Sequence, residues 1–89
     1  MRTCRRVVVG GRVQAVGFRA TCAREARRAG VAGWVTNRDD GMVEALFEGD
    51  AGAVDAMVAW MRQGPPGARV ETHQTTEEQP GDRPDFRIG

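Results

Sequence analysis

Hydrophobic and polar residues repeat with two different periods along this chain, and each change of period marks a predicted element. Residues 5–9 are rich in β-branched side chains and stop at Gly10-Gly11, which is typical of a strand followed by a loop. From residue 18 the apolar residues recur at steps of three and four, which predicts an amphipathic helix that Gly30 ends in the left-handed conformation. The apolar positions of this helix are Phe18, Cys22, Ala26 and Ala29.

The middle of the chain alternates between apolar and polar residues with a period of two. Residues 31–37 and 42–48 both follow this pattern, and the second run places Phe47 on one face and Glu48 on the other. Between them, residues 39–41 read Asp-Asp-Gly, which is typical of a tight turn. The two runs therefore predict a β-hairpin.

A second helix is expected after the hairpin, with the Asp50 side chain as its N-cap and residues 64–66 (Gly-Pro-Pro) as its end. Its apolar face consists of Val54, Met57, Val58 and Met61. Residues 68–77 predict a further strand that is polar and exposed on one face, and residues 85–88 predict a short additional strand. The order βαββαβ indicates an α+β, ferredoxin-like sandwich over residues 1–89, a single domain in which an antiparallel sheet carries two helices on one face.

The composition is that of an ordinary globular protein, with 40% hydrophobic and 28% charged residues. No apolar run approaches the roughly 20 residues that span a bilayer, and the apolar run near the N-terminus is too short for a signal peptide. We therefore expect a cytoplasmic protein without a membrane partner. Cys4 and Cys22 are too few and too far apart for a disulfide scaffold or a metal site, and we expect two free thiols packed as small apolar groups.

The net charge is only +1, but the charges are unevenly distributed. Residues 1–30 contain eight arginines and one acid, whereas the remainder contains five arginines and eleven acids. This asymmetry leaves two interpretations open. Either the first third of the chain binds an anionic partner, or Arg24, Arg27 and Arg28 form a solvated helix face.

The stretch from Gly10 to Arg19 is the strongest candidate for a functional site. Backbone N–H groups in a glycine-containing loop before a helix can converge on an anion, and a guanidinium can hold two oxygens of a phosphate-like group. Asn37, at the end of the second predicted strand, could then face Arg19. Arg19 as a helix-surface residue, and Asn37 as a turn residue with positive φ, are the simpler structural interpretations.

Two segments together resemble the paired signature of the acylphosphatases. They are GRVQAVGFR, residues 11–19, and GWVTNRDDGMVEALFEG, residues 33–49, and the resemblance extends to the closing residues 85–88. The resemblance implies the same βαββαβ fold and a carboxylic-phosphoric mixed anhydride as substrate, hydrolysed without metal or cofactor.

Residue by residue, the resemblance implies that Arg19 binds the phosphate and that Asn37 orients the attacking water. The backbone N–H groups that complete the phosphate site are those of Gln14, Ala15, Val16, Gly17 and Phe18. The expected partners are a small-molecule acyl phosphate and inorganic phosphate, as product and inhibitor, with no nucleic acid partner. We expect a monomer, because Trp34 and Leu46 form the only candidate apolar patch and can belong to a sheet face.

One residue departs from the family pattern, because Ala15 stands where the family usually has glycine. If this position needs a positive φ, the Cβ costs on the order of 1 to 2 kcal/mol. A non-catalytic anion-binding or regulatory module of the same fold is therefore kept as an alternative. An RNA-binding domain of the RRM type is disfavoured because residues 42–49 lack the basic-glycine-aromatic pattern and the chain has no tyrosine. The lone His73 is expected on the surface, away from any catalytic role.

Overall fold

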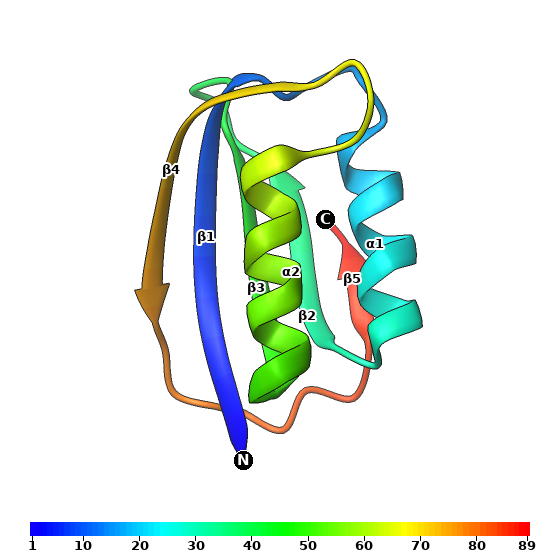
Figure 1. Cartoon of the computed structure of the whole chain (residues 1–89), viewed down its shortest axis with the longest axis vertical. Helices are drawn as coiled ribbons and strands as arrows, with labels where there is room; N and C mark the ends of the chain where they lie inside the picture. The colour runs from blue at the N-terminus through cyan, green and yellow to red at the C-terminus, as the bar shows by residue number, and fades with distance from the viewer.

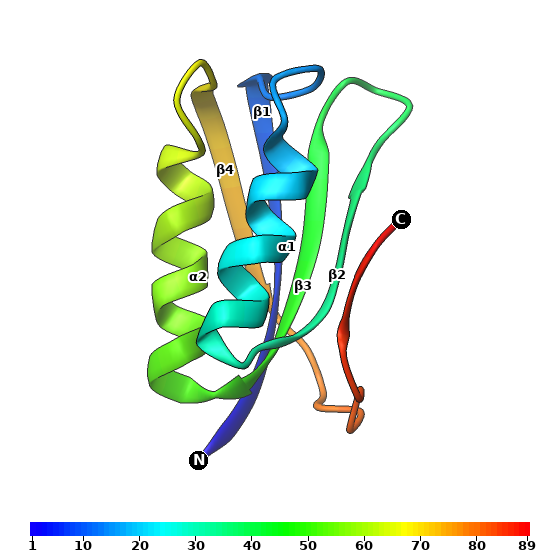
Figure 2. The same ribbon diagram turned by 90° about the vertical axis from the view of Figure 1, so that its right-hand side faces the viewer.

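A five-stranded sheet forms one layer of the molecule, and two helices that cover one face of the sheet form the other (Figures 1 and 2). The computed structural model describes all residues, 1–89. The elements in chain order are β1 (Arg2–Arg12), α1 (Phe18–Ala29), β2 (Ala32–Asn37), β3 (Val43–Asp50), α2 (Ala51–Gln63), β4 (Arg69–Glu77) and β5 (Phe86–Ile88). The predicted ferredoxin-like order is therefore confirmed.

The sheet has the order β4-β1-β3-β2-β5. Its four long strands pair antiparallel, as predicted. The short strand β5 joins the edge of the sheet parallel to β2, with Phe86 opposite Gly33 and Ile88 opposite Val35. The end of the chain is thereby brought beside the first helix, which the order of elements alone did not predict (Figure 1).

The predicted stop of the first strand at Gly10-Gly11 is wrong, because β1 continues to Arg12. Its pairing with β4 changes register between Gly10 and Gly11 and then goes on. Gly11 has a φ of 122°, and a Cβ there would collide with the backbone carbonyl of Arg69. These glycines therefore allow β1 and β4 to approach closely at this irregularity. The loop between β1 and α1 consists only of residues 13–17 and is shorter than a loop that begins at Gly10. We call it the first loop.

The predicted apolar faces meet between the two layers. Phe18, Cys22 and Ala26 are buried on α1, whereas the predicted fourth residue, Ala29, is exposed at the end of the helix. The whole predicted face of α2 is buried. The Asp50 side chain accepts a hydrogen bond of 3.3 Å from the Gly52 N–H, as expected of an N-cap. Gly30 ends α1 in the left-handed conformation with a φ of 73°. Both helix boundaries derived from these residues are confirmed.

Both cysteines are free and buried, as predicted. Burial raises the pKa of Cys22 to about 12, so its thiol stays protonated at neutral pH and acts as an apolar group. Burial also raises the pKa of Cys4.

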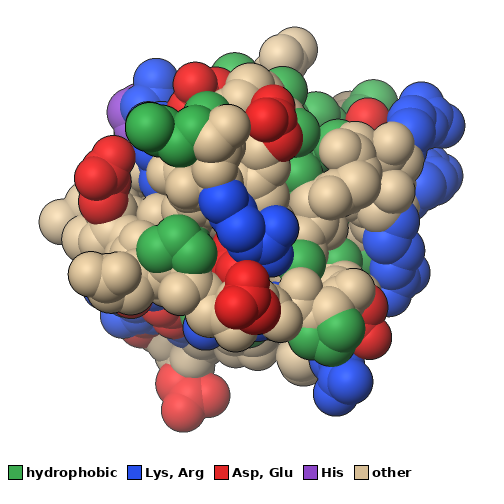
Figure 3. Space-filling view, turned by 90° about the horizontal axis from the view of Figure 1, so that it is seen from below, with side chains coloured by type: hydrophobic (Ala, Val, Ile, Leu, Met, Phe, Trp, Pro, Cys, Tyr) green, Lys and Arg blue, Asp and Glu red, His purple; other side chains and the backbone are tan.

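Arg24, Arg27 and Arg28 lie on the exposed side of α1, and Figure 3 shows basic side chains gathered along the edge of the molecule where α1 lies. The Nε and Nη2 groups of Arg27 both donate to the Phe86 carbonyl, at 3.3 and 2.9 Å, and so connect α1 to β5. The Nη1 atom of Arg28 lies 3.9 Å from Oε2 of Glu25. Part of this basic face is thus structural. Neither helix combines the length and the apolar stretch that a membrane crossing requires.

Glu48 is a fully buried acid, although the alternation of β3 placed it on the polar face. The segment between β4 and β5 covers that face: Arg83 Nη1 donates to Glu48 Oε1 at 2.7 Å, and the Asp82 N–H donates to Oε2 at 2.7 Å. Arg2 Nη2 donates to Oε2 at 2.9 Å. Burial alone would raise the pKa of Glu48, but the Gly81 N–H, both arginines and the Asp82 N–H together lower it to about 2. Glu48 therefore fixes the segment that leads into β5.

Candidate active site

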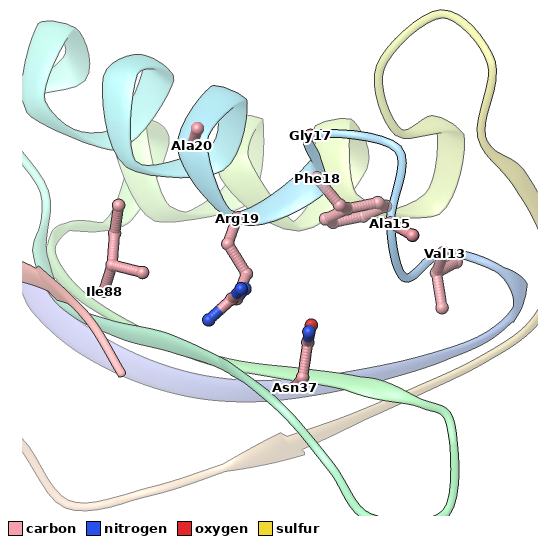
Figure 4. A pocket seen from close by; sticks show the side chains of 8 residues that line it. All are labelled: Val13, Ala15, Gly17, Phe18, Arg19, Ala20, Asn37 and Ile88. Atoms are coloured by element: carbon pink, nitrogen blue, oxygen red, sulfur yellow. The ribbon is translucent and has the colours of Figure 1, made fainter.

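A cavity of about 280 Å³ opens where the first loop, the start of α1, the end of β2 and β5 meet (Figure 4). Eight residues line it: Val13, Ala15, Gly17, Phe18, Arg19, Ala20, Asn37 and Ile88. Arg19 is the only charged residue among them. The two residues that sequence analysis singled out for chemistry, Arg19 and Asn37, thus line one cavity.

The first loop leads its backbone directly into the N-terminus of α1. Ala15 has a φ of 61° and Gly17 a φ of 73°, so two residues of this short loop adopt the left-handed conformation. Gly17 is the N-cap of α1, where no side chain accepts a hydrogen bond from the helix N–H groups and no acid lies in the first turn. The first N–H groups of α1 therefore remain available to an anion, which the helix dipole also favours.

Ala15, which stands where the family usually has glycine, does adopt a positive φ. Its φ of 61° lies in the left-handed region, where a Cβ is unfavourable by on the order of 1 to 2 kcal/mol. The chain keeps this conformation because both ends of the loop are held. Val13 is completely buried, and the Phe18 ring, 2% exposed, packs edge-on against Trp60 with 5.4 Å between ring centroids.

The Gln14 side chain fastens the first loop to the β2–β3 hairpin, a role that sequence analysis missed. Its Nε2 group donates to the backbone carbonyls of Arg38 and Met42, at 2.9 and 3.0 Å. The turn itself is closed by the Asp40 carboxylate, which accepts from the Met42 N–H at 3.1 Å. This hydrogen bond, with Arg38 nearby, lowers the pKa of Asp40. Loop and hairpin therefore form one unit that fixes the distance from the loop to Asn37.

Arg19 is the second residue of α1, and its half-buried side chain points into the cavity (Figure 4). Its Nη1 group donates to the Gly89 carbonyl at 2.9 Å. No Asp or Glu side chain lies within ion-pair distance of it. This arrangement differs from that of a solvated helix-surface arginine, because one nitrogen is oriented by a backbone carbonyl while the others remain available.

Asn37 is the last residue of β2, where its backbone pairs with Val43. The interpretation of Asn37 as a turn residue with positive φ is wrong, since the only non-glycine residues with positive φ are Ala15 and Asp82. Its main-chain carbonyl accepts from Thr36 Oγ1 at 3.3 Å, while its side-chain amide has no partner in the protein. Figure 4 shows this amide reaching into the cavity beside Arg19.

The side chains of two predicted loop residues point away from the cavity. Gln14 turns to the hairpin, as described, and Val16 packs against the core. Their predicted contribution is through backbone N–H groups and does not depend on where their side chains lie. Three further residues line the cavity: Val13, Ala20 and Ile88. Ile88 belongs to the closing segment that carried the family resemblance, but its position beside Arg19 depends on the parallel pairing of β5 with β2, which sequence analysis did not predict.

Neither a metal cluster nor a catalytic histidine is found at this site. No group of three or more His, Cys, Asp and Glu side chains could hold a metal ion. His73 is exposed on β4, opposite Val9, and does not line the cavity, as its surface assignment predicted. What the cavity offers is one cation, backbone donors and one neutral amide, a set that can bind an anionic group and hold a water beside it.

Comparisons with known proteins agree on one family. Residues 5–88 match the family model for acylphosphatase. An acylphosphatase of Rubrobacter xylanophilus is 58% identical over 73 residues, which are 82% of this chain and 66% of that protein. One of Thermococcus kodakarensis is 50% identical over 78 residues, covering 88% of this chain and 86% of that protein. The crystal structure of acylphosphatase from Bacillus subtilis, 40% identical, has a TM-score of 0.92 over 100% of this chain and 99% of that one.

The extent of these matches favours an enzyme over the non-catalytic anion-binding module. The chain belongs to the acylphosphatase family, and its activity is the hydrolysis of acyl phosphates to a carboxylate and inorganic phosphate.

Proposed function

We propose that this hydrolysis takes place in the cavity between the first loop, Arg19 and Asn37, by direct attack of water on phosphorus. The observation that carries the proposal is the shared cavity: a guanidinium with no Asp or Glu partner, a helix N-terminus without a side-chain cap and an unpartnered amide line the same space. The first two bind the phosphoryl group, and the third orients the water.

Arg19 and the backbone N–H groups of residues 14–18 bind the phosphoryl group. The guanidinium presents several N–H donors in one plane, and the helix N-terminus supplies partial positive charge. In phosphoryl transfer, negative charge is spread over the three equatorial oxygens of the transition state. Donors that are already oriented toward these oxygens stabilise the charge without reorganisation during the reaction.

Asn37 orients the water. Its amide carries both an acceptor and a donor, so the carbonyl oxygen can accept from the water while the NH₂ group donates to the water oxygen or to a phosphoryl oxygen. Because its backbone is fixed in β2 and the hairpin is fastened to the first loop by Gln14, the water is held at a constant position relative to the bound phosphorus.

The leaving group requires no general acid. The acyl phosphate expels a carboxylate, and the conjugate acid of a carboxylate has a pKa of about 4, so it departs as an anion at neutral pH. The water oxygen forms its bond to phosphorus as the bond from phosphorus to the carboxylate oxygen breaks, and a proton of the water passes to the product phosphate or to solvent. No phosphoenzyme is formed.

Inorganic phosphate, the product of the reaction, carries negatively charged oxygens like those of the phosphoryl group that the site binds. We therefore propose that inorganic phosphate occupies the same donors and inhibits competitively. A monomer is proposed because the large exposed hydrophobic residues are only Met1 and Ile88, while Leu46, half of the candidate patch, is 3% exposed. The cytoplasmic location stays a prediction, with which two free buried thiols agree.

Two substitutions test the assigned roles separately. Arg19→Ala removes the phosphate ligand, so we expect a fall in kcat/KM of about 10³-fold or more together with loss of inhibition by inorganic phosphate. Asn37→Ala removes only the orientation of the water, so kcat should fall about 10²-fold or more while the inhibition constant of phosphate stays within about twofold. The measurements are steady-state hydrolysis of benzoyl phosphate and its inhibition by phosphate.

Arg24→Ala is the matched control, because Arg24 is exposed on the same helix, does not line the cavity and makes no hydrogen bond or ion pair in the structure. It should behave as the wild type does. An Asn37→Ala variant that binds phosphate poorly but keeps its turnover would show that the two roles are assigned wrongly.

A further inference from the structure

The lining of the cavity beyond Arg19 and Asn37 is apolar, although the phosphoryl group needs none of it. Val13 and Phe18 belong to this lining but are 0% and 2% exposed, so they form its floor and offer little surface. The accessible apolar groups are Ala15 in the first loop, Ala20 on α1 and Ile88 on β5. Ile88, at 45% exposed, is the largest of them.

Ile88 is held in place by the hydrogen bonds of its neighbours. It pairs with Val35 of β2, and the Gly89 N–H donates to the Val35 carbonyl at 2.7 Å. The Gly89 carbonyl in turn accepts from Arg19 at 2.9 Å. Two residues earlier, the buried Phe86 ring stacks on Phe47, with 5.7 Å between centroids. The Ile88 side chain is therefore fixed at the mouth of the cavity, one residue from the contact that orients the guanidinium.

The position of Ile88 relative to the phosphoryl site indicates what it meets. In the view of Figure 4, Arg19 lies between the first loop and Ile88, with Ala20 above Ile88 on the first turn of α1. A phosphoryl group bound to the loop N–H groups and Arg19 fills the loop side of the cavity, so the acyl group bonded to it must extend away from the loop. The surface on the Ile88 side has no charged lining residue besides Arg19.

We propose that Ile88, together with Ala20, forms the subsite for the acyl group, and that this enzyme prefers acyl phosphates whose acyl group is apolar and larger than acetyl. The proposal rests on the function proposed above, because it takes the phosphoryl site as given. Covering the half-exposed Ile88 with an apolar acyl group removes both surfaces from water, whereas an acetyl group is too small to reach it. Ile88 is thus a specificity-determining residue that leaves the chemical step to Arg19 and Asn37.

The expected effect is modest and selective. One methylene more or less in a hydrophobic pocket changes kcat/KM by roughly 10- to 200-fold, and Ile88 is only partly covered, so the low end of that range applies. For Ile88→Ala we expect kcat/KM for benzoyl phosphate to fall about tenfold, mainly through KM, and kcat/KM for acetyl phosphate to stay within about twofold. The wild type itself should prefer benzoyl phosphate.

Two further variants separate contact from folding. Ile88→Thr keeps the β-branched shape that suits a strand but introduces a hydroxyl, so it should fold as the wild type does and still lose the preference for the benzoyl group. Arg87→Ala is the matched control, because Arg87 is exposed on the same strand, is paired with Asp85 at 3.1 Å and does not line the cavity. It should leave both substrates unaffected, and thermal unfolding of each variant shows whether β5 has stayed in place.

The possible results decide between this inference and the function on which it rests. If the wild type hydrolyses both substrates and Ile88→Ala and Ile88→Thr lower both equally, Ile88 acts by positioning Arg19 and the subsite is wrong. If the Ile88 variants change neither, the acyl group does not reach Ile88, and the subsite is again wrong. If Arg19→Ala hydrolyses benzoyl phosphate as fast as the wild type does, the proposed phosphoryl site itself fails, and the subsite fails with it.

Discussion

Replacing Glu48 by glutamine should destabilise the protein strongly at neutral pH and hardly at all at pH 2. The folded structure holds the pKa of Glu48 at about 2, against an ordinary value of 4.5. At 1.36 kcal/mol for each pKa unit, this difference corresponds to stabilisation on the order of 3 kcal/mol. At pH 7 a glutamine also turns an N–H group toward Arg2 or Arg83, whereas at low pH the protonated carboxyl presents an O–H group to the same donors, so this cost separates the two proteins only while Glu48 is ionised.

The pH range follows from the direction of the shift. Because the pKa is lowered on folding, the stabilisation is fully present above about pH 4.5 and is lost as the pH falls toward 2. The wild type should therefore lose stability over this range, and the difference between wild type and Glu48→Gln should close. For a domain of this size, 3 kcal/mol corresponds to a decrease of roughly 15 °C in Tm at pH 7.

The assay is urea-induced unfolding at pH 7, 4 and 2, followed by the fluorescence of Trp34 and Trp60. Asp55→Asn is the control, because Asp55 pairs with Arg5 at 2.6 Å but is 57% exposed, and a surface pair contributes at most about 1 kcal/mol. An equal loss of stability in both variants at pH 7, or a gap for Glu48→Gln that persists at pH 2, would refute the assigned role of Glu48.

Two further predictions concern the first loop. Ala15→Gly removes the strain of a Cβ at a φ of 61°, so activity on benzoyl phosphate should be equal to that of the wild type or higher. The free energy of unfolding should change by no more than about 1 kcal/mol, because glycine also gains entropy in the unfolded chain. A large loss of activity would show that the loop requires alanine. Gln14→Ala removes both hydrogen bonds to the hairpin, so kcat should fall about tenfold because the distance between the first loop and Asn37 is no longer fixed. Unchanged kinetics would show that the hairpin keeps its position relative to the loop without Gln14.

The features that local patterns encode were predictable from the sequence. The faces of both helices, the cap at Asp50, the left-handed end at Gly30 and the Asp-Asp-Gly turn each depend on a few neighbouring residues, and the structure confirms them except for Ala29, which is exposed at the end of α1. The pairing of Arg19 with Asn37 in one cavity was also anticipated, because the order of elements brings the end of β2 near the start of α1.

Features that depend on contacts between distant segments were not predictable. In the sequence, Gly10 and Gly11 indicate the end of a strand. In the structure they lie within β1 and allow the close approach of β4, a strand that is about 60 residues away in the chain. The alternation of β3 placed Glu48 on the solvent side, because nothing in the local pattern shows that residues 81–83 cover it. Likewise Gln14 and Ile88 acquire their places only when the hairpin and β5 have assembled around the cavity.

The most direct test of the central claim, that Arg19 and its cavity are the site of hydrolysis, is the turnover of benzoyl phosphate by the wild type beside Arg19→Ala in the presence of a metal chelator. We expect steady hydrolysis by the wild type that the chelator does not change, and a loss of about 10³-fold or more in Arg19→Ala with unaltered thermal unfolding. Turnover by a folded Arg19→Ala within a few-fold of the wild type would contradict it.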